Sequence, residues 1–265
     1  MEQFTTCGIQ NISKKIAKEF IIFVNTNKSF NDNNLELMLL LNKINSNIQA
    51  ALLLTSRKLF GESKIIFRSA FESLVLFMYL LEYPKEMTHY HDDNYMTEVK
   101  NVYMCYKRDF ANIQNVIDCY KKFESKISRK DSPFEKIGID NPKFENELDK
   151  YFRGDDRNCF KPLSQQIMYM IKKLNDTMIF EICNLSRLQV TIYNLNSEVA
   201  HSRLSTLHLP LGNLTKEETI REIKKSFFQA VNLWDCLIKI LEVKYKYKHP
   251  EKLSSLLQNL AYYSI

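Results

Sequence analysis

Two residues in an otherwise apolar stretch of this sequence have types and spacing that chemistry can use. Arg68 and Glu72 lie four residues apart, so a helix places both side chains on one face, and their apolar neighbours predict that the pair is buried. One interpretation is a structural ion pair, because a buried charge persists only when it is paired. The other is the floor of a binding site in which Arg68 meets an anion.

A second polar group follows about 120 residues later in the chain. Its members share a helical face opposite the apolar stripe of Leu188, Ile192, Leu195 and Val199, and they are Tyr193, Asn194, Ser197 and His201. Hydroxyl, amide and imidazole groups indicate a hydrogen-bonded network or the lining of a site. His201 is the natural acid–base candidate, because histidine titrates near neutral pH. A structural histidine with satisfied hydrogen bonds is the alternative.

Taken together, the two groups resemble a bacterial family of unknown function. The helix Arg68-Ser-Ala-Phe-Glu72 and the later segment Tyr193-x-x-x-Ser197-x-x-x-His201 are similar to the R-x-x-x-E and S-x-x-x-H helices of domain-of-unknown-function family 5677. The resemblance covers roughly residues 35–245. It implies an all-α fold in which these polar residues converge, and it implies no activity.

A weaker resemblance links the chain to helical HEPN-type domains, many of which are ribonucleases in toxin and anti-phage systems. Arg203 and His208 fit the spacing of their Arg–His pair, although chance supplies that spacing easily and Leu204 stands where those domains prefer a polar residue. This resemblance implies a metal-independent endoribonuclease. His201 would be the base and Arg68 would hold the phosphate.

The elements that position these residues are expected to be helices throughout. Only five glycines and six prolines occur in 265 residues, which argues against sandwiches, barrels and Pro-rich disorder. Gly61 and Pro84 are expected to end helices, and Thr215 with Glu218 predicts a capping box. Helical periodicity predicts helices over 9–25, 35–60, 62–83, 85–128 with a break around 91–94, 163–175, 178–208 with a break, 216–245 and 250–263.

The predicted fold is one all-α domain over residues 1–265, with seven to nine helices and one irregular insertion. Residues 129–162 contain three of the six prolines and two of the five glycines. We expect this segment to be a surface insertion with one short helix near 143–152.

Charge and cysteine content limit the partners and the compartment. The net charge of +6 is widely spread rather than gathered in the basic stripe of a dedicated nucleic-acid binder. The one concentrated run, Lys239 to Lys252, predicts either the solvated last turns of a helix or a phosphate-contacting patch. The six cysteines lack zinc spacing, and the His89-Tyr-His91-Asp-Asp93 segment cannot converge on one ion from a helix, so we predict no metal and no cofactor. We expect a cytoplasmic protein with reduced thiols and no membrane span.

Two functions from different classes follow from these observations. The preferred one is an interaction or sensor module, in a stress or anti-phage defence system, whose Arg68, Glu72, Ser197 and His201 form a buried polar network. The other is the ribonuclease, and whether the chain is an enzyme stays open. The candidate binding residues are Tyr193, Asn194, Arg203 and His208. The expected partners are a second copy of the chain, an RNA or another protein.

Overall fold

Helices are the only regular secondary structure in the part of the chain that the structure describes. A computed structural model describes residues 14–16, 18–19, 21–23, 26, 35–128, 130–154, 159–194, 196 and 214–246, and no strand occurs in these ranges. This confirms the all-α fold class. The α-helices are α3 (Leu35–Ser56), α4 (Phe60–Glu82), α5 (Glu86–Tyr106), α6 (Ile113–Phe123), α7 (Pro133–Lys136), α8 (Phe144–Arg153), α9 (Ile167–Leu174), α10 (Met178–Ile182), α11 (Leu185–Leu188) and α13 (Lys216–Tyr245). The 3-10 helices are η1 (Glu124–Lys126) and η2 (Leu163–Gln165), and η3 (Gln189–Asn194) is a π-helix.

Contacts between residues divide the chain into two compact units. Unit 1 comprises Met1–Glu82 and Met170–Ile265, and unit 2 comprises Tyr83–Tyr169. The division falls inside α9. That residues 1–265 form a single domain stays a prediction.

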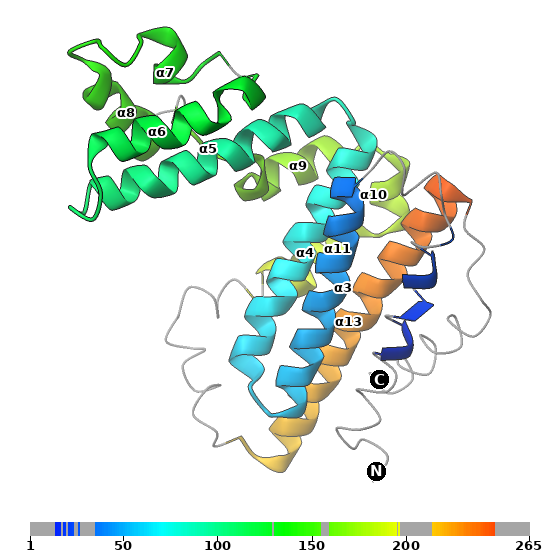
Figure 1. Cartoon of the computed structure of the whole chain (residues 1–265). Coiled ribbons are helices and arrows are strands. Elements are labelled where there is room, and N and C mark those ends of the chain that lie inside the picture. The colour runs from blue at the N-terminus through cyan, green and yellow to red at the C-terminus, as the bar shows by residue number, and fades with distance from the viewer. Residues whose placement is uncertain are drawn as a thin grey trace. The chain divides into compact units, whose positions relative to one another are not determined.

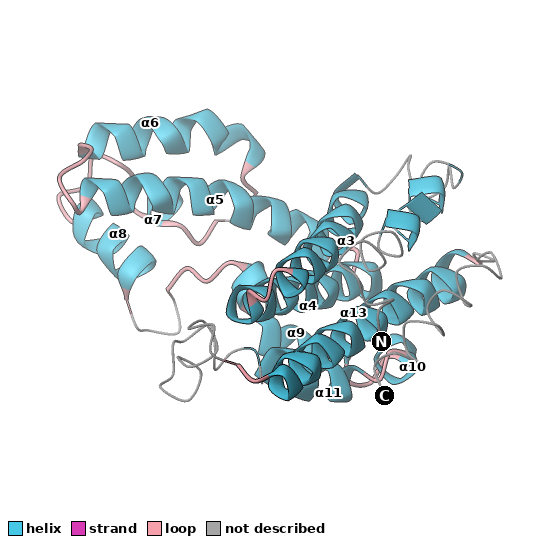
Figure 2. Cartoon of the chain, turned by 90° about the horizontal axis from the view of Figure 1, so that it is seen from below, coloured by secondary structure: helices cyan, strands magenta, loops and turns pink. Residues whose placement is uncertain are grey.

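Three long helices, α3, α4 and α13, lie side by side in unit 1 (Figures 1 and 2). α3 and α4 form an antiparallel hairpin, and α13 runs in the same direction as α4. Ion pairs join α4 and α13 near both ends: Lys64 Nζ lies 2.7 Å from Glu222 Oε2, and Lys244 Nζ lies 2.8 Å from Glu82 Oε1. The two helices are therefore held in one register along most of their length.

Helix α3 is the element whose composition raises the question of a membrane. Among the described helices, it alone is long and apolar enough to cross one by length and composition. Its buried stripe includes Leu37, Leu41 and Ile48, and its buried Asn45 accepts a hydrogen bond from the Trp234 indole of α13 at 3.1 Å. A helix that buries one face against protein partners has the pattern of a core helix.

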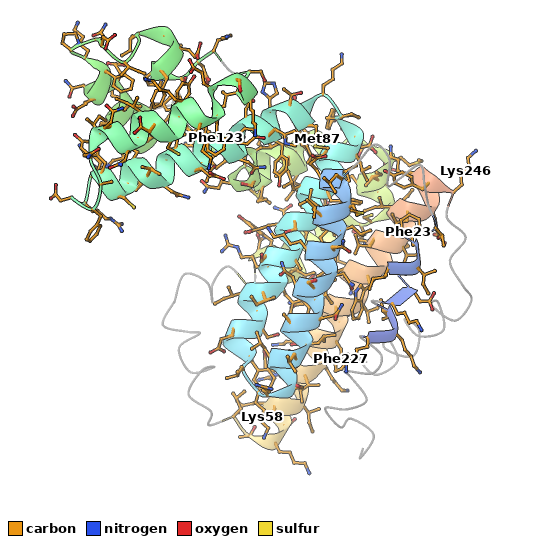
Figure 3. All side chains as sticks on the ribbon, viewed as in Figure 1. Phe23, Lys58, Met87, Phe123, Phe227 and Lys246 are labelled. Atoms are coloured by element: carbon orange, nitrogen blue, oxygen red, sulfur yellow. The ribbon has the colours of Figure 1, made fainter. Side chains whose placement is uncertain are left out.

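The turn between α3 and α4 differs from the sequence prediction. Gly61 was expected to break the helix, but it is buried in the first turn of α4. Lys58 takes the left-handed conformation instead, with φ of 61°, and the Leu59 amide bonds back to the Leu54 carbonyl at 2.9 Å. This is a Schellman-type helix end, which any residue can close when packing compensates the cost of positive φ. Lys58 is labelled at this turn in Figure 3.

Unit 2 is built on the antiparallel pair α5 and α6 (Figure 1). The predicted break around 91–94 is wrong, because α5 is continuous through it. The chain turns at 107–112 instead, where Asp109 has φ of 60° and Asn112 forms a capping box with Asn115 at the start of α6.

Residues of the segment 129–162 help to form the core of unit 2. Phe134, Phe144, Leu148 and Phe160 are buried in one apolar cluster with Phe123, which is labelled in Figure 3. The short helix expected near 143–152 is confirmed as α8. The apolar residues of α8 lie on one face of the helix, and this face packs into the cluster formed with α5 and α6.

Several helix ends agree closely with the sequence. α4 ends at Glu82, before Pro84, and α13 spans 216–245 as predicted, with the Thr215 and Glu218 capping box formed. The predicted helix over 250–263 lies outside the described residues, as does much of the one over 9–25.

Candidate functional site

The candidate site begins with an ion pair on α4. Arg68 Nε donates a hydrogen bond to Glu72 Oε1 at 2.8 Å, as spacing of four on one helix face requires. The two side chains are 20% and 31% exposed, so the prediction that this pair is buried is wrong. Ile65, one turn earlier, is itself exposed, which leaves this end of the α4 face open to solvent.

Tyr193 brings the second predicted group to this ion pair. The guanidinium carbon of Arg68 lies 5.0 Å from the centroid of the Tyr193 ring, which is a cation–π geometry. Tyr193 also packs against Phe71, with ring centroids 5.9 Å apart. The ring thus contacts two neighbouring turns of α4 and keeps the plane of the Arg68 head in place.

Tyr193 belongs to a π-helix, which the sequence did not indicate. In η3 the hydrogen bonds connect residues five apart; such wider turns occur mostly as short segments within helices, and frequently at functional sites. Ile192 is buried as predicted, whereas Tyr193 is half-buried and Asn194 is exposed. Because a π-helix has a wider turn, the residues that share a face in η3 differ from those that α-helical spacing predicts.

Gln229 of α13 anchors the π-helix. Its Nε2 donates to the Thr191 carbonyl at 2.9 Å and to Asn196 Oδ1 at 3.3 Å, and Asn196 Nδ2 donates back to Gln229 Oε1 at 3.3 Å. Both amides are buried. Because buried polar groups must be hydrogen-bonded, this reciprocal pair holds η3 against α13 and thereby positions Tyr193.

One turn before Arg68, Lys64 contributes to a second set of charges. The buried Glu222 carboxylate of α13 lies 2.7 Å from Lys64 Nζ and 2.8 Å from Lys225 Nζ. Burial raises the pKa of Glu222, but the hydrogen bonds from Lys225 and Lys64 lower it by more, so it lies below its usual value. Glu222 is therefore ionised at neutral pH and is the ion-pair partner of the Lys64 ammonium group.

Arg68 keeps hydrogen-bonding capacity that its partners do not use. Glu72 occupies Nε, and the two terminal amino groups make no hydrogen bond to any residue that the structure describes. Two parallel N–H groups on a planar fork match a carboxylate or a phosphate. The arrangement can therefore bind an anion without giving up the Glu72 contact.

The predicted site residues divide into two sets. The structure brings together Arg68, Glu72 and Tyr193, and places Asn194 on the same π-helix as Tyr193. The other predicted residues lie outside the described ranges, and they are Ser197, His201, Arg203 and His208. Their acid–base and binding roles stay predictions.

The carboxylates of the His89–Asp93 segment have structural partners. Asp92 Oδ2 accepts a hydrogen bond from Ser128 Oγ at 2.9 Å, and Asp93 Oδ2 accepts one from the Leu163 amide at 2.6 Å. Both carboxylates are buried and tie other segments of unit 2 to α5. Within the described ranges, no three His, Cys, Asp or Glu side chains are grouped to hold a metal.

Sequence reasoning missed the polar residues of α13 that support the site. Glu222, Ser226 and Gln229 occupy positions i, i+4 and i+7 of a stripe that continues as the buried Leu233 and Leu237. Polar residues at core-facing positions of a helical repeat are the signal that would have found them.

Comparison with known proteins supports the resemblance seen in the sequence. The model of the family of unknown function (DUF5677) matches residues 36–219, a range that contains Arg68, Glu72, Tyr193 and Asn194. No curated protein and no solved structure matches the chain. Because the family model covers more than half of the chain, this protein belongs to the family of unknown function DUF5677.

Proposed function

We propose that this protein is an interaction or sensor module in which Arg68 recognises an anionic group of a ligand or partner. The observation that carries the proposal is the state of the Arg68 head: oriented by Glu72 at 2.8 Å, placed 5.0 Å from the Tyr193 ring, and partly exposed. A guanidinium fixed on two sides loses little freedom when its remaining N–H groups bind an anion.

The expected setting is the bacterial cytosol, in a stress or anti-phage defence system. Support for a cytosolic location comes from the cysteines, since all five that lie in described ranges are free thiols, as a reducing compartment favours. The packing of α3 against α13 through Asn45 and Trp234 supports a soluble fold.

Calorimetric titration with inorganic phosphate, and separately with acetate, tests the anion site. Arg68→Lys keeps the charge but loses the planar fork, so we expect binding about tenfold weaker or worse, and Arg68→Gln should abolish it. Arg153→Gln is the matched control, because Arg153 also pairs with a carboxylate four residues away, Asp149, on an exposed helix face.

Two results would contradict the proposal. One is a wild-type protein that binds neither anion, and the other is an Arg68→Gln variant that binds as well as the wild type. Loss of fold is a separate outcome, and the emission of Trp234, the chain's only tryptophan, reports it. An ion pair this exposed contributes at most about 1 kcal/mol to stability, so the Arg68 variants should remain folded.

The ribonuclease is the second candidate, and the partial exposure of Arg68 favours it as well, because a phosphate contact needs an accessible cation. Incubating RNA with wild-type protein, His201→Ala and Arg68→Gln separates the two functions. RNA cleavage that is lost in both variants would show that the protein is a ribonuclease and not only a binding module. Anion binding without cleavage would support the binding module.

A further inference from the structure

A pair of buried cysteines joins the segment before the site to α13. Cys183 caps the C-terminal end of α10, and Cys236 lies in the middle of α13. Cys236 Sγ lies 3.2 Å from the Cys183 carbonyl oxygen, and Cys183 Sγ lies 3.8 Å from the Cys236 carbonyl oxygen. Each sulfur is therefore directed at the other residue.

These two thiols are in contact with each other and shielded from solvent. Cys183 is 5% and Cys236 is 2% exposed, and both are reduced. The hydrogen bond that the Cys236 thiol donates to Cys183, together with burial, raises the pKa of the Cys236 thiol well above its usual value. The Cys236 thiol is consequently protonated in the resting protein, and both thiols are shielded from solvent, whereas Cys105 is exposed.

We propose that Cys183 and Cys236 form a reversible disulfide when the protein meets a peroxide. Each sulfur lies 3.8 Å or less from the carbonyl oxygen of the other residue, so the two residues are close neighbours, and rotation of their side chains would bring the sulfurs together. Access requires only local opening of the five-residue helix α10, which is held by few hydrogen bonds of its own.

The chemistry balances with hydrogen peroxide as the oxidant. Once α10 opens, the Cys183 thiol gives up its proton and the sulfur attacks one peroxide oxygen, the O–O bond breaks, and the released hydroxide takes up that proton and leaves as water. The Cys236 sulfur then attacks the resulting sulfenic acid, the S–S bond forms, and a second water leaves. Two thiols have lost two electrons, and the peroxide has gained them.

The bond would join α10, which lies before α11 and η3 in the chain, to α13, which anchors η3 through Gln229. Cys183 and Cys236 are 53 residues apart, and the enclosed chain contains α11, η3 and the first two-thirds of α13. Gln229 lies within that loop and already anchors η3 to α13. Oxidation therefore fixes the end of α10 on α13 and closes a loop around the segment that carries Tyr193. The closed loop lowers the conformational entropy of the unfolded chain, which stabilises the folded protein.

Peptide mass spectrometry after peroxide treatment tests this proposal. The full-length protein is oxidised, its free thiols are alkylated, and the digest is searched for linked peptides. We expect a Cys183–Cys236 link as the dominant product, a loss of two alkylatable thiols, and a higher thermal midpoint that dithiothreitol reverses. Cys183→Ser and Cys236→Ser should each abolish all three effects.

The exposed cysteine supplies the control. Cys105→Ser should leave the link and the thermal shift unchanged, because Cys105 lies in unit 2. Alkylated thiols at both Cys183 and Cys236 after oxidation would overturn the proposal. So would conversion of either residue to a sulfinic acid, or a link to one of the other cysteines in their place. Circular dichroism on the oxidised sample shows whether the link formed in the folded protein.

Discussion

Glu222 shows what a single buried carboxylate does in this protein. It is 5% exposed on α13, and its two oxygens lie within 2.8 Å of Lys64 and Lys225. Such a group is stable as an ion only while both lysines remain in place, so it links the stability of unit 1 to pH. Arg68, by comparison, lies in a more exposed pair that contributes little to stability and keeps N–H groups available for a ligand.

The pH dependence of stability should therefore depend on Glu222. Its pKa in the folded protein lies below its value of 4.5 in a free chain, so the stabilisation is complete above about pH 4.5 and is lost as the pH falls through the folded pKa. In Glu222→Gln we expect the free energy of unfolding at pH 7 to fall by about 1–3 kcal/mol. As the pH is lowered, the variant should lose less of its remaining stability than the wild type does.

Urea unfolding of unit 1, followed by Trp234 fluorescence at pH 7 and at pH 4, measures both effects. Glu217→Gln is the control, because Glu217 is an exposed glutamate of the same helix. An unchanged acid slope in Glu222→Gln would show that other carboxylates set the pH dependence.

At the scale of elements, some helix ends are set by neighbouring residues and others by the packing of helices. The start of α13 depends on residues three apart: Thr215 Oγ1 accepts the Glu218 amide at 3.2 Å, and Glu218 Oε2 accepts the Thr215 amide at 2.9 Å. The sequence predicts this start correctly because the cap is made by neighbours. The turn after α3 is closed by Lys58 rather than by Gly61, since the packing of α3 on α4 determines where the hairpin turns.

Removing the cap at the start of α13 should destabilise unit 1 measurably. We expect Thr215→Ala to lower the free energy of unfolding by about 1 kcal/mol, because an amide of the first turn loses its acceptor. Thr215→Ser keeps the hydroxyl and should stay close to wild type, and Thr219→Ala is a control one turn later. Urea midpoints from Trp234 fluorescence distinguish the three variants, and equal losses in Thr215→Ala and Thr219→Ala would contradict the capping role.

At the scale of the whole molecule, each unit has its own apolar core. Trp234, Phe71 and Leu41 are buried in unit 1, while Leu148 and Tyr103 are buried in unit 2. Units with separate cores can lose structure in separate steps. The segment 129–162, unusual in its prolines and glycines, helps to complete one of these cores.

Truncating one core should therefore loosen one unit only. Leu148→Ala removes a fully buried side chain and should cost about 3 kcal/mol within unit 2. Hydrogen–deuterium exchange resolved by peptide should then rise in α5, α6 and α8 but not in α3, α4 or α13. The reciprocal variant Leu41→Ala should reverse this pattern. Equal acceleration in both units after either substitution would mean that they unfold together.

By itself, the sequence determined the features that depend on residues close together in the chain. The all-α class, the end of α4 before Pro84, the span of α13 with its cap, and the pairing of Arg68 with Glu72 follow from spacing within one or two turns. Only the tertiary structure decided that Tyr193 lies over Arg68, that Gln229 holds a π-helix, and that Lys64 meets Glu222. Periodicity indicates which face of a helix is apolar, but the partner of each residue is set by how helices distant in sequence pack together.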